Sequence, residues 1–283
     1  MTRSLLRAGF SVTVCPHRRR DPVERLVADG AAAAADPFEV ARASDVLILC
    51  VPDAPQVEES LFGDRGASSG LTTDAVVIDM STISPIASKG FAARLAQQKI
   101  GFVDAPVSGG PARAKEGTLT IMAGGARPTF DRVEPVLKAM GTPHYLGDVG
   151  MGETVKLVNQ IIIASVMIAN AEALNFAKRA GADLQSVRKV IATATGSNYV
   201  LDQWLPKTWF AGSFEGGFAM DLLRKDVAAA LDAARAMKYA MPQTGLAYQL
   251  YTARSAEGDG ALDYSAIAKW YERIAGDDGD ETQ

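Results

Sequence analysis

The first 150 residues alternate short apolar runs with stretches of helical spacing, and this alternation constrains the fold more than any other feature. The run VLILCV between Asp45 and Pro52 is continuously apolar, and 75–80 is mostly apolar, as in strands buried on both faces of a parallel sheet. Helices are expected after them, at 54–62 and 85–98. The sequence therefore predicts a doubly wound α/β domain over residues 1–150.

Strand signals stop after Gly152. Residues 154–179 carry apolar side chains at helical spacing for about seven turns. Further helices are expected at 184–194, 198–205, 220–237, 242–257 and 264–274. The sequence thus predicts an all-helical domain over 151–283, and the acidic tail 276–283 is expected to be disordered.

Composition narrows the class of protein. Lys plus Arg number 29 against 33 Asp plus Glu, so no nucleic-acid or other basic-surface function is indicated. The most apolar run, 161–169, is too short to span a membrane. Cys15 and Cys50 lie in apolar runs and are expected to be buried in a reducing compartment. A cytoplasmic protein is predicted.

Two segments of the first domain follow strands and carry polar groups. In DAPVSGG, the hydroxyl of Ser108 and the close backbone approach that Gly109 and Gly110 allow suit a small carboxylate, although a plain turn is an equal alternative. Ser81 and Thr82 follow the run at 75–80. They could contact a cofactor, but capping of the next helix, by Ser81 or by Ser84, is the more common use of such hydroxyls.

The tract His17-Arg18-Arg19-Arg20 follows the second strand position of the domain. In dinucleotide-binding folds, an acidic residue near this point binds the ribose 2′-hydroxyl, whereas arginine accommodates a 2′-phosphate. No Asp or Glu occurs between Val12 and Arg20, so the sequence favours NADP over NAD, with Arg18 and Arg20 as the binding residues. A solvated charge run is the alternative.

Lys156 is the strongest catalytic candidate, although from spacing alone an ordinary surface lysine is at least an equal alternative. The chain has only two histidines, His17 and His144, and neither has an evident carboxylate partner for a proton relay. A lysine on a partly apolar helix beside a nicotinamide can have its pKa lowered until it acts as a general acid. Asn159, three residues later, shares its helical face and could bind substrate. No His/Cys cluster at metal-ligand spacing occurs, so no metal site is predicted.

Four motifs in order resemble the 3-hydroxyisobutyrate dehydrogenase family of β-hydroxyacid dehydrogenases, relatives of 6-phosphogluconate dehydrogenase. They are DAPVSGG, GTLTIMAGG, GxGxxxKLVNQ and GFAMDLLRKD, and they extend over nearly the whole chain. The resemblance implies a Rossmann-like doubly wound parallel sheet followed by an all-α domain. It also implies an NAD(P)-dependent oxidoreductase.

The resemblance also implies residue roles. Lys156 would be the catalytic acid/base. Substrate would be bound by Ser108, Gly109, Gly110, Asn159 and Phe218, and the dinucleotide by Val51, Pro52, Thr82 and Lys225. Related imine reductases usually lack the lysine, which argues against that branch.

Two departures from the family pattern stand out. The strand and GxGxxG loop that open the family's first domain are absent, and this loop cradles the pyrophosphate. A start codon assigned too late is expected, because a buried parallel sheet tolerates the loss of a central strand badly. A truncated form with impaired cofactor binding is the alternative. Arg113 stands where a small residue is more usual, and it could recruit a second acidic group of the substrate or face solvent.

The leading hypothesis is a dehydrogenase that prefers NADP, with NAD possible, and interconverts a small 3-hydroxy acid and its semialdehyde. A tartronate semialdehyde (2-hydroxy-3-oxopropionate) reductase is the alternative within the family. From another class, the chain could be a non-catalytic remnant. A homodimer or homotetramer is expected from the resemblance, through the long apolar helices after Gly152.

Overall fold

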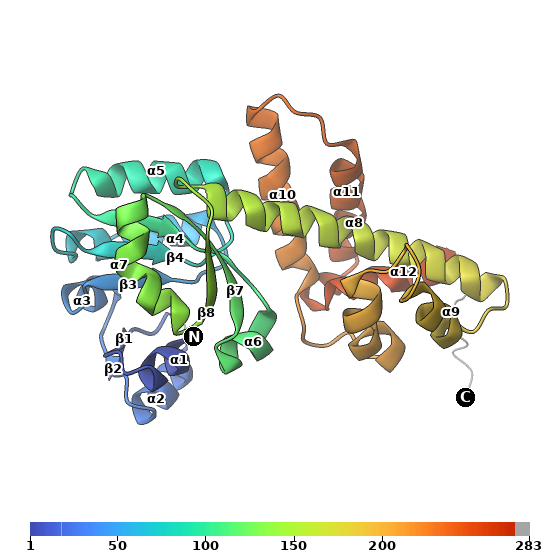
Figure 1. The fold of residues 1–283 in the computed structure, drawn as a ribbon, viewed down its shortest axis with the longest axis horizontal. Coiled ribbons are helices and arrows are strands. Elements are labelled where there is room, and N and C mark those ends of the chain that lie inside the picture. Colours follow the sequence, from blue (N-terminus) through green and yellow to red (C-terminus); the bar gives the residue numbers. More distant parts are fainter. Residues whose placement is uncertain (18, 275–283) are drawn as a thin grey trace. The chain divides into compact units, whose positions relative to one another are not determined.

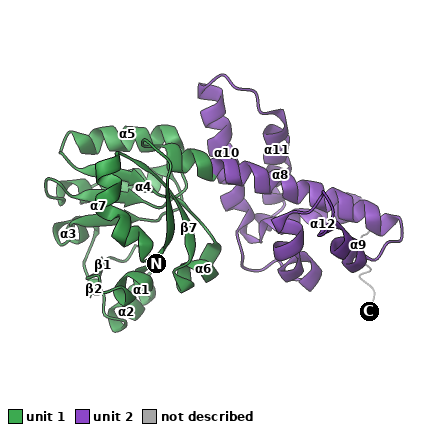
Figure 2. Ribbon diagram, viewed as in Figure 1, with its two compact units in different colours: residues 1–156 green, residues 157–283 purple. Residues whose placement is uncertain are grey.

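The computed structural model describes residues 1–17 and 19–274. The chain divides into two compact units, Met1–Lys156 and Leu157–Gln283 (Figure 2). The sequence predicted domains at 1–150 and 151–283, and the structural division falls slightly later, inside the long helix that follows the sheet. Two predictions concern residues outside those described: the disorder of 276–283 and the cofactor-binding role of Arg18.

Unit 1 contains a sheet with helices on both faces (Figure 1). Its strands are β1 (Thr13–Val14), β2 (Ala32–Ala33), β3 (Val46–Leu49), β4 (Val76–Asp79), β5 (Gly101–Asp104), β6 (Val107–Ser108), β7 (Leu119–Gly125) and β8 (Gly141–Tyr145). Its helices are α1 (Thr2–Arg7), α2 (Asp21–Ala28), α3 (Pro37–Arg42), α4 (Ala54–Phe62), η1 (Ala67–Ser69), α5 (Pro85–Ala96), α6 (Gly110–Glu116) and α7 (Arg127–Lys138).

The strands form two separate sheets. β1 and β2 pair in parallel with each other, and the larger sheet has the order β3-β4-β5-β7-β6, with β8 also paired to β7. β3, β4 and β5 are parallel, whereas β7 runs antiparallel to both β5 and β6. The predicted α/β fold is confirmed, but the sheet is mixed rather than wholly parallel.

Both faces of the larger sheet are covered, as a doubly wound fold requires. Every residue of β4 is buried, and successive side chains of a strand point to opposite faces. Val77 packs in a core with apolar residues of α4 and α5, whereas Val76 and Ile78 pack in a second core with residues of α1 and α7. The continuous apolar run is therefore explained by burial on two sides.

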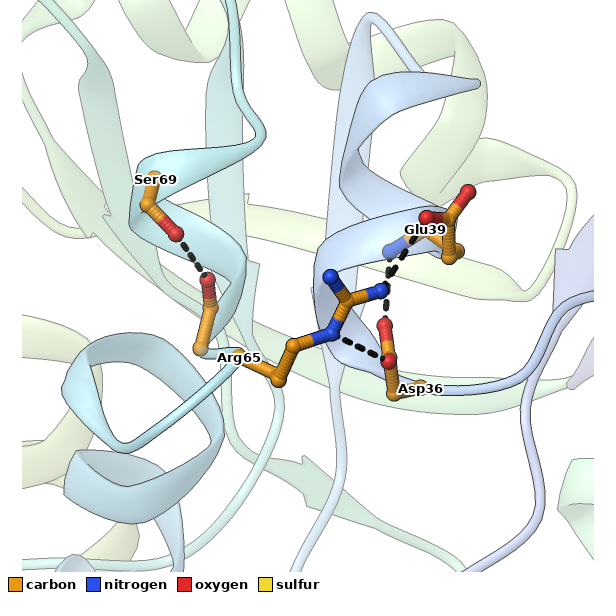
Figure 3. A network of polar contacts seen from close by, with 5 residues as sticks. Asp36, Glu39, Arg65 and Ser69 are labelled. Carbon is orange, nitrogen blue, oxygen red and sulfur yellow. Dashed lines mark hydrogen bonds and ion pairs between the residues drawn. The ribbon is translucent and has the colours of Figure 1, made fainter.

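Helix α3 is not among the elements predicted from the sequence. Asp36 caps it: its Oδ1 accepts a hydrogen bond from the backbone N–H of Glu39 at 2.9 Å. Arg65 donates to the other oxygen of Asp36 at 2.7 Å and to Glu39 at 3.1 Å (Figure 3). The Arg65 guanidinium lowers the pKa of Asp36. An Asp-Pro pair is a start signal for a helix and could have revealed this one.

Unit 2 is built from helices and short turns. Helix α8 (Met151–Arg179) begins in unit 1 and continues through unit 2 (Figure 1). The other elements are α9 (Leu184–Ile191), η2 (Val200–Trp204), η3 (Leu205–Lys207), η4 (Trp209–Ala211), α10 (Met220–Ala236), α11 (Pro242–Ala256), η5 (Asp259–Ala261), η6 (Tyr264–Ala266) and α12 (Ile267–Ile274). The helix predicted at 198–205 is present but irregular: a π-helix spans Val200–Trp204, and a 3₁₀ helix follows at Leu205–Lys207, where the ring of Pro206 interrupts α-helical hydrogen bonding.

Buried polar groups hold the irregular segments of unit 2. Asp263, fully buried, accepts hydrogen bonds from the indole N–H of Trp204 at 3.0 Å and from the backbone N–H of Phe218 at 2.9 Å. Trp209 donates to Glu272 at 2.9 Å, and the fully buried Tyr251 donates to a backbone carbonyl of α8 at 3.2 Å. Each bond satisfies a group whose desolvation would otherwise cost about 1–3 kcal/mol.

Helix α8 is long and apolar enough to cross a membrane, judged by length and composition alone. In the folded protein, 44% of its most apolar 18-residue window is buried. Buried polar side chains also lie along it, namely Gln160, Asn170 and Asn175. The cytoplasmic location stays a prediction. The expectation that both cysteines are buried is wrong, because Cys15 is half-buried and Cys50, just beyond the end of β3, is exposed.

The first turn of α8 lies unusually close to the strand ends beneath it. A Cβ atom at Gly152 would stand 2.2 Å from the carbonyl oxygen of Met122 and 2.7 Å from that of Asp104. At Gly124, on β7, a Cβ atom would stand 2.8 Å from the backbone nitrogen of Gly152. Only glycine permits this approach, so the two glycines fix where the helix begins.

We expect Gly152→Ala to lower the free energy of unfolding by at least about 1–3 kcal/mol, because backbone atoms must move to admit the methyl group. The matched control is Gly90→Ala in α5, where a Cβ atom would meet nothing within 4 Å. Alanine there should stabilise the helix by up to about 1 kcal/mol. Urea unfolding followed by circular dichroism, with amide exchange of β5 and β7, measures both. Equal stability of the two variants would contradict the close approach.

Candidate active site

Three parallel strands end side by side at one edge of the sheet in unit 1. Leu49 pairs with Asp79, and Asp79 pairs with Asp104, so the segments that follow β3, β4 and β5 emerge together. In open α/β sheets, ligands bind beyond such carboxyl ends. This edge is therefore the candidate ligand-binding site of unit 1.

The structure joins two of the predicted cofactor-binding segments at this edge. The backbone N–H of Val51 donates to the hydroxyl oxygen of Ser81 at 3.0 Å, and the N–H of Ser81 donates to Asp79 at 3.0 Å. Val51 and Pro52 thus lie beside Ser81 and Thr82. Of the two serines considered as helix caps, Ser84 caps α5, so Ser81 serves to link the two loops instead.

The predicted 2′-phosphate site is only partly described. Arg18 lies outside the described residues. Arg20 is exposed and immediately precedes α2, while Arg19 pairs with Asp21 at 2.8 Å. Arg20 is thus presented to solvent at the end of the segment that follows β1.

The predicted carboxylate-binding segment has a backbone that only glycine adopts easily. Ser108 ends β6, and Gly109 and Gly110 follow with φ of +133° and +65°. Gly110 then begins α6, a short helix that the sequence did not predict. The side chain of Arg113 lies against Gly109: a Cβ atom there would stand 2.8 Å from the Cβ and Cδ of Arg113.

Asp104, which the sequence analysis did not place in the site, anchors the start of α8. Its Oδ1 accepts a hydrogen bond from the backbone N–H of Gly150 at 2.7 Å, and its Oδ2 accepts one from that of Glu153 at 2.9 Å. Glu153 in turn accepts a hydrogen bond from the N–H of Ile83 at 3.1 Å. A carboxylate at a helix N-terminus is favoured by the helix dipole, so these bonds hold the first turn of α8 at the sheet edge.

Lys156 follows Glu153 by three residues, on the same side of α8. It is buried, with 7% of its surface exposed, so the alternative of an ordinary surface lysine is excluded. Burying a lysine is costly unless its charge is compensated, and such residues are often functional. Its position is set by the anchored first turn.

In unit 2, the predicted residue Asn159 begins a hydrogen-bonded chain whose far end, Asp226, forms an ion pair with the predicted residue Lys225. Asn159 Nδ2 donates to Gln160 Oε1 at 2.9 Å, and Gln160 Nε2 donates to Asp226 Oδ2 at 2.7 Å. The ammonium of Lys225 lies 2.8 Å from Asp226 Oδ1. Gln160 and Asp226 are not among the site residues predicted from the sequence. The available signal was an acidic residue, Asp226, at a position of α10 surrounded by apolar residues at helical spacing.

Phe218 does not belong to this hydrogen-bonded chain. Its backbone is held by Asp263, and its ring contacts Tyr264 edge-on at 6.3 Å between centroids. Among the described residues, no group of three or more His, Cys, Asp or Glu side chains could hold a metal ion.

Comparison with known proteins identifies the family. The profile of the NAD-binding domain of 6-phosphogluconate dehydrogenase matches residues 1–160, and that of the NAD-binding domain of NADP-dependent 3-hydroxyisobutyrate dehydrogenase matches residues 150–271. The chain is 38% identical over 277 residues to 2-hydroxy-3-oxopropionate reductase of Escherichia coli, covering 97% of this chain and 94% of that protein. It is 36% identical over 277 residues to 2-(hydroxymethyl)glutarate dehydrogenase of Eubacterium barkeri, covering 98% and 92%.

Solved structures agree. The 3-hydroxyisobutyrate dehydrogenase of Salmonella typhimurium matches with a TM-score of 0.85 and 33% identity, covering 95% of this chain and 94% of that one. The chain therefore belongs to the 3-hydroxyisobutyrate dehydrogenase family of β-hydroxyacid dehydrogenases, related to 6-phosphogluconate dehydrogenase. It is an NAD(P)-dependent hydroxyacid dehydrogenase, and its cofactor is a nicotinamide dinucleotide.

Asp104 should make stability depend on pH. Desolvation raises the pKa of its carboxyl group from 3.8 to about 6, against the opposing effect of its backbone hydrogen bonds. The folded protein therefore holds this proton more tightly than the unfolded chain. The bound proton therefore stabilises the folded state, and this stabilisation has its full size below about pH 4. As the pH rises through about 6 it is lost, and the free energy of unfolding falls by roughly 3 kcal/mol.

We compare the free energy of unfolding of the wild type with that of Asp104→Asn. Between about pH 4 and pH 7, the wild type should lose roughly 3 kcal/mol relative to the variant. Other acidic groups are common to both proteins and cancel. Urea unfolding at several pH values measures the difference. A difference that stays constant with pH would show that the Asp104 carboxyl group titrates alike in the folded and unfolded states.

Proposed function

We propose that this enzyme interconverts a small 3-hydroxy acid and its semialdehyde, with Lys156 as the acid/base. The observation that carries the proposal is a buried lysine on a helix whose first turn is anchored at the ligand-binding edge of the sheet. The names of several relatives, including 2-hydroxy-3-oxopropionate reductase and 3-hydroxyisobutyrate dehydrogenase, support this substrate class.

In the proposed mechanism, a nicotinamide dinucleotide held at the sheet edge would supply the hydride for reduction of the aldehyde, or take it up in the reverse direction. The ammonium of Lys156 donates its proton to the carbonyl oxygen as the alcohol forms and takes the proton back in oxidation. The backbone N–H groups of Gly109 and Gly110 and the hydroxyl of Ser108 bind the substrate carboxylate. Asn159 orients the polar groups beside the reacting carbon, and Phe218 lines the pocket.

We propose NADP as the preferred cofactor. Val51, Pro52 and Thr82 at the sheet edge, and Lys225, would contact the dinucleotide, while Arg20, together with Arg18, would bind the 2′-phosphate. The exposure of Arg20 beyond β1 supports this role, since a guanidinium recognises phosphate oxygens in a bidentate manner.

We propose that the protein is a homodimer or homotetramer. The helical unit exposes large apolar side chains that a second copy would cover. They are Val158 (49% exposed), Ile162 (54%), Leu246 (60%) and Phe176 (76%). A monomer in light scattering at micromolar concentration would contradict this.

We expect Lys156→Met to lower kcat by about 10²–10⁴ for both 3-hydroxyisobutyrate oxidation and 2-hydroxy-3-oxopropionate reduction, because the proton donor is lost. NADPH affinity should persist. Lys138→Ala, which removes only an exposed pair with Glu134, is the control. Steady-state kinetics and fluorescence titration measure these quantities, and near-normal kcat in Lys156→Met would refute the assignment.

For the cofactor, we expect Arg20→Ala to raise the Kd of NADPH by roughly 10-fold or more, as the loss of a charge-assisted hydrogen bond implies. The Kd of NADH should stay unchanged. Arg25→Ala, which loses an exposed pair with Asp21 one helical turn later, is the matched control. Equal losses for both dinucleotides, or tighter binding of NADH by the wild type, would contradict NADP preference.

A further inference from the structure

Two hydrogen bonds hold the segment that follows β4, one on each side of Thr82. On the β3 side, the hydroxyl oxygen of Ser81 accepts a hydrogen bond from the backbone N–H of Val51 at 3.0 Å. On the α8 side, the backbone N–H of Ile83 donates to Glu153 Oε2 at 3.1 Å. Thr82 thus lies between a contact with the loop after β3 and a contact with the first turn of α8.

Within residues 79–83, Thr82 alone is not buried. Met80, Ser81 and Ile83 are at most 3% exposed, whereas Thr82 is half-buried. The side chain of Ile83 packs in the apolar core that α4 and α5 cover, which fixes the position of its backbone. Thr82 is therefore the residue of this segment that a ligand at the sheet edge can reach.

Glu153 connects this segment to α8. It is fully buried, and its own backbone N–H donates to Asp104 Oδ2 at 2.9 Å. Glu153 therefore bonds the end of β5 through its main chain and the segment after β4 through its side chain. Among the described residues, no other group accepts a hydrogen bond from the N–H of Ile83. A buried N–H group without an acceptor is costly, so this contact is strongly favoured.

The helix extends this connection to Lys156. Lys156 lies three residues after Glu153, a rise of about 4.5 Å along the axis of α8. Over so short a distance a hydrogen-bonded helix is stiff, so a shift at Glu153 also shifts Lys156. Placement matters for catalysis, because a displacement of about 1 Å can lower a rate by roughly 10²-fold.

We propose that Glu153 is a positioning residue that places Lys156 relative to the nicotinamide dinucleotide. It does so by bonding the segment of Thr82 to the first turn of α8. This rests on the proposed function, in which Thr82 contacts the dinucleotide and Lys156 moves the proton. Glu153 acts through these two residues and contacts neither substrate nor cofactor, since it is fully buried.

The first test separates the hydrogen bond of Glu153 from its charge. Glu153→Gln keeps an oxygen that accepts from the N–H of Ile83, whereas Glu153→Ala removes the acceptor. At saturating NADPH, Glu153→Ala should lower kcat roughly 10- to 100-fold, while Glu153→Gln stays within about 3-fold of the wild type. Near-normal kcat in Glu153→Ala, or an equal loss in Glu153→Gln, would overturn the proposal.

The matched control is Thr154→Val. Thr154 is the next residue of the same turn, and its hydroxyl donates to the backbone carbonyl of Gly150 at 2.7 Å. Valine removes this hydrogen bond at similar shape, but the contact between Glu153 and Ile83 stays. Its kcat should remain within about 3-fold of the wild type. A loss as large as that of Glu153→Ala would mean that any weakening of the turn suffices, and the proposal would be wrong.

A double-mutant cycle gives a readout that a merely structural role would not change. If Glu153 acts by placing Lys156, its substitution matters only while the lysine is present. In the Lys156→Met background, Glu153→Ala should lower the remaining kcat by less than about 3-fold. Equal losses in the two backgrounds would contradict the proposal.

Amide hydrogen exchange without dinucleotide separates this proposal from the proposed function. The N–H of Ile83, followed by NMR, should exchange at least roughly 10-fold faster in Glu153→Ala than in the wild type. Its exchange should stay near the wild-type rate in Glu153→Gln and Thr154→Val. Equal exchange in Glu153→Ala and the wild type would refute the connection, whatever the activity. Absence of turnover by the wild type would refute the function, while the exchange of Ile83 would still decide the connection.

Discussion

The anchoring of α8 by Asp104 is the interaction on which the arrangement of unit 1 depends. One carboxylate at the end of β5 satisfies two backbone N–H groups that a helix start leaves without intrahelical partners. Gly124 and Gly152 remove the side chains that would otherwise keep the helix away from the strands. The first turn of α8 is therefore held against the ends of the strands, and this contact sets the position of Lys156 within unit 1.

Much of this organisation is readable from the sequence, because long periodic segments carry strong signals. The buried strands at β3 and β4 and the helices α4 and α8 follow directly from apolar patterning. Shorter elements do not: α6 comprises only Gly110–Glu116, and its N-terminal glycines indicate a turn rather than a helix. The helix expected at 198–205 is a π-helix that ends in a 3₁₀ helix at Pro206, and its irregular form is not visible in the apolar pattern.

The parts of the site that sequence reasoning missed depend on contacts between distant residues. Asp104 accepts hydrogen bonds from residues 46 and 49 positions further along the chain, and Gln160 meets Asp226 across 66 positions. A motif shows which residue types are present, but the direction of an amide follows from a partner that only the folded chain supplies. Arg113 beside Gly109 is a similar case, since spacing alone does not show that its side chain lies on the glycine turn.

The tryptophans give the two units separate spectroscopic signatures. All three, Trp204, Trp209 and Trp270, belong to the helical unit, and two of them donate hydrogen bonds to acidic side chains there. Intrinsic indole emission therefore reports the environment of the helical unit alone, whereas Tyr145 is the only tyrosine of the sheet unit. Selective excitation of indole therefore follows the helical unit of this enzyme, without fluorescence from the sheet unit.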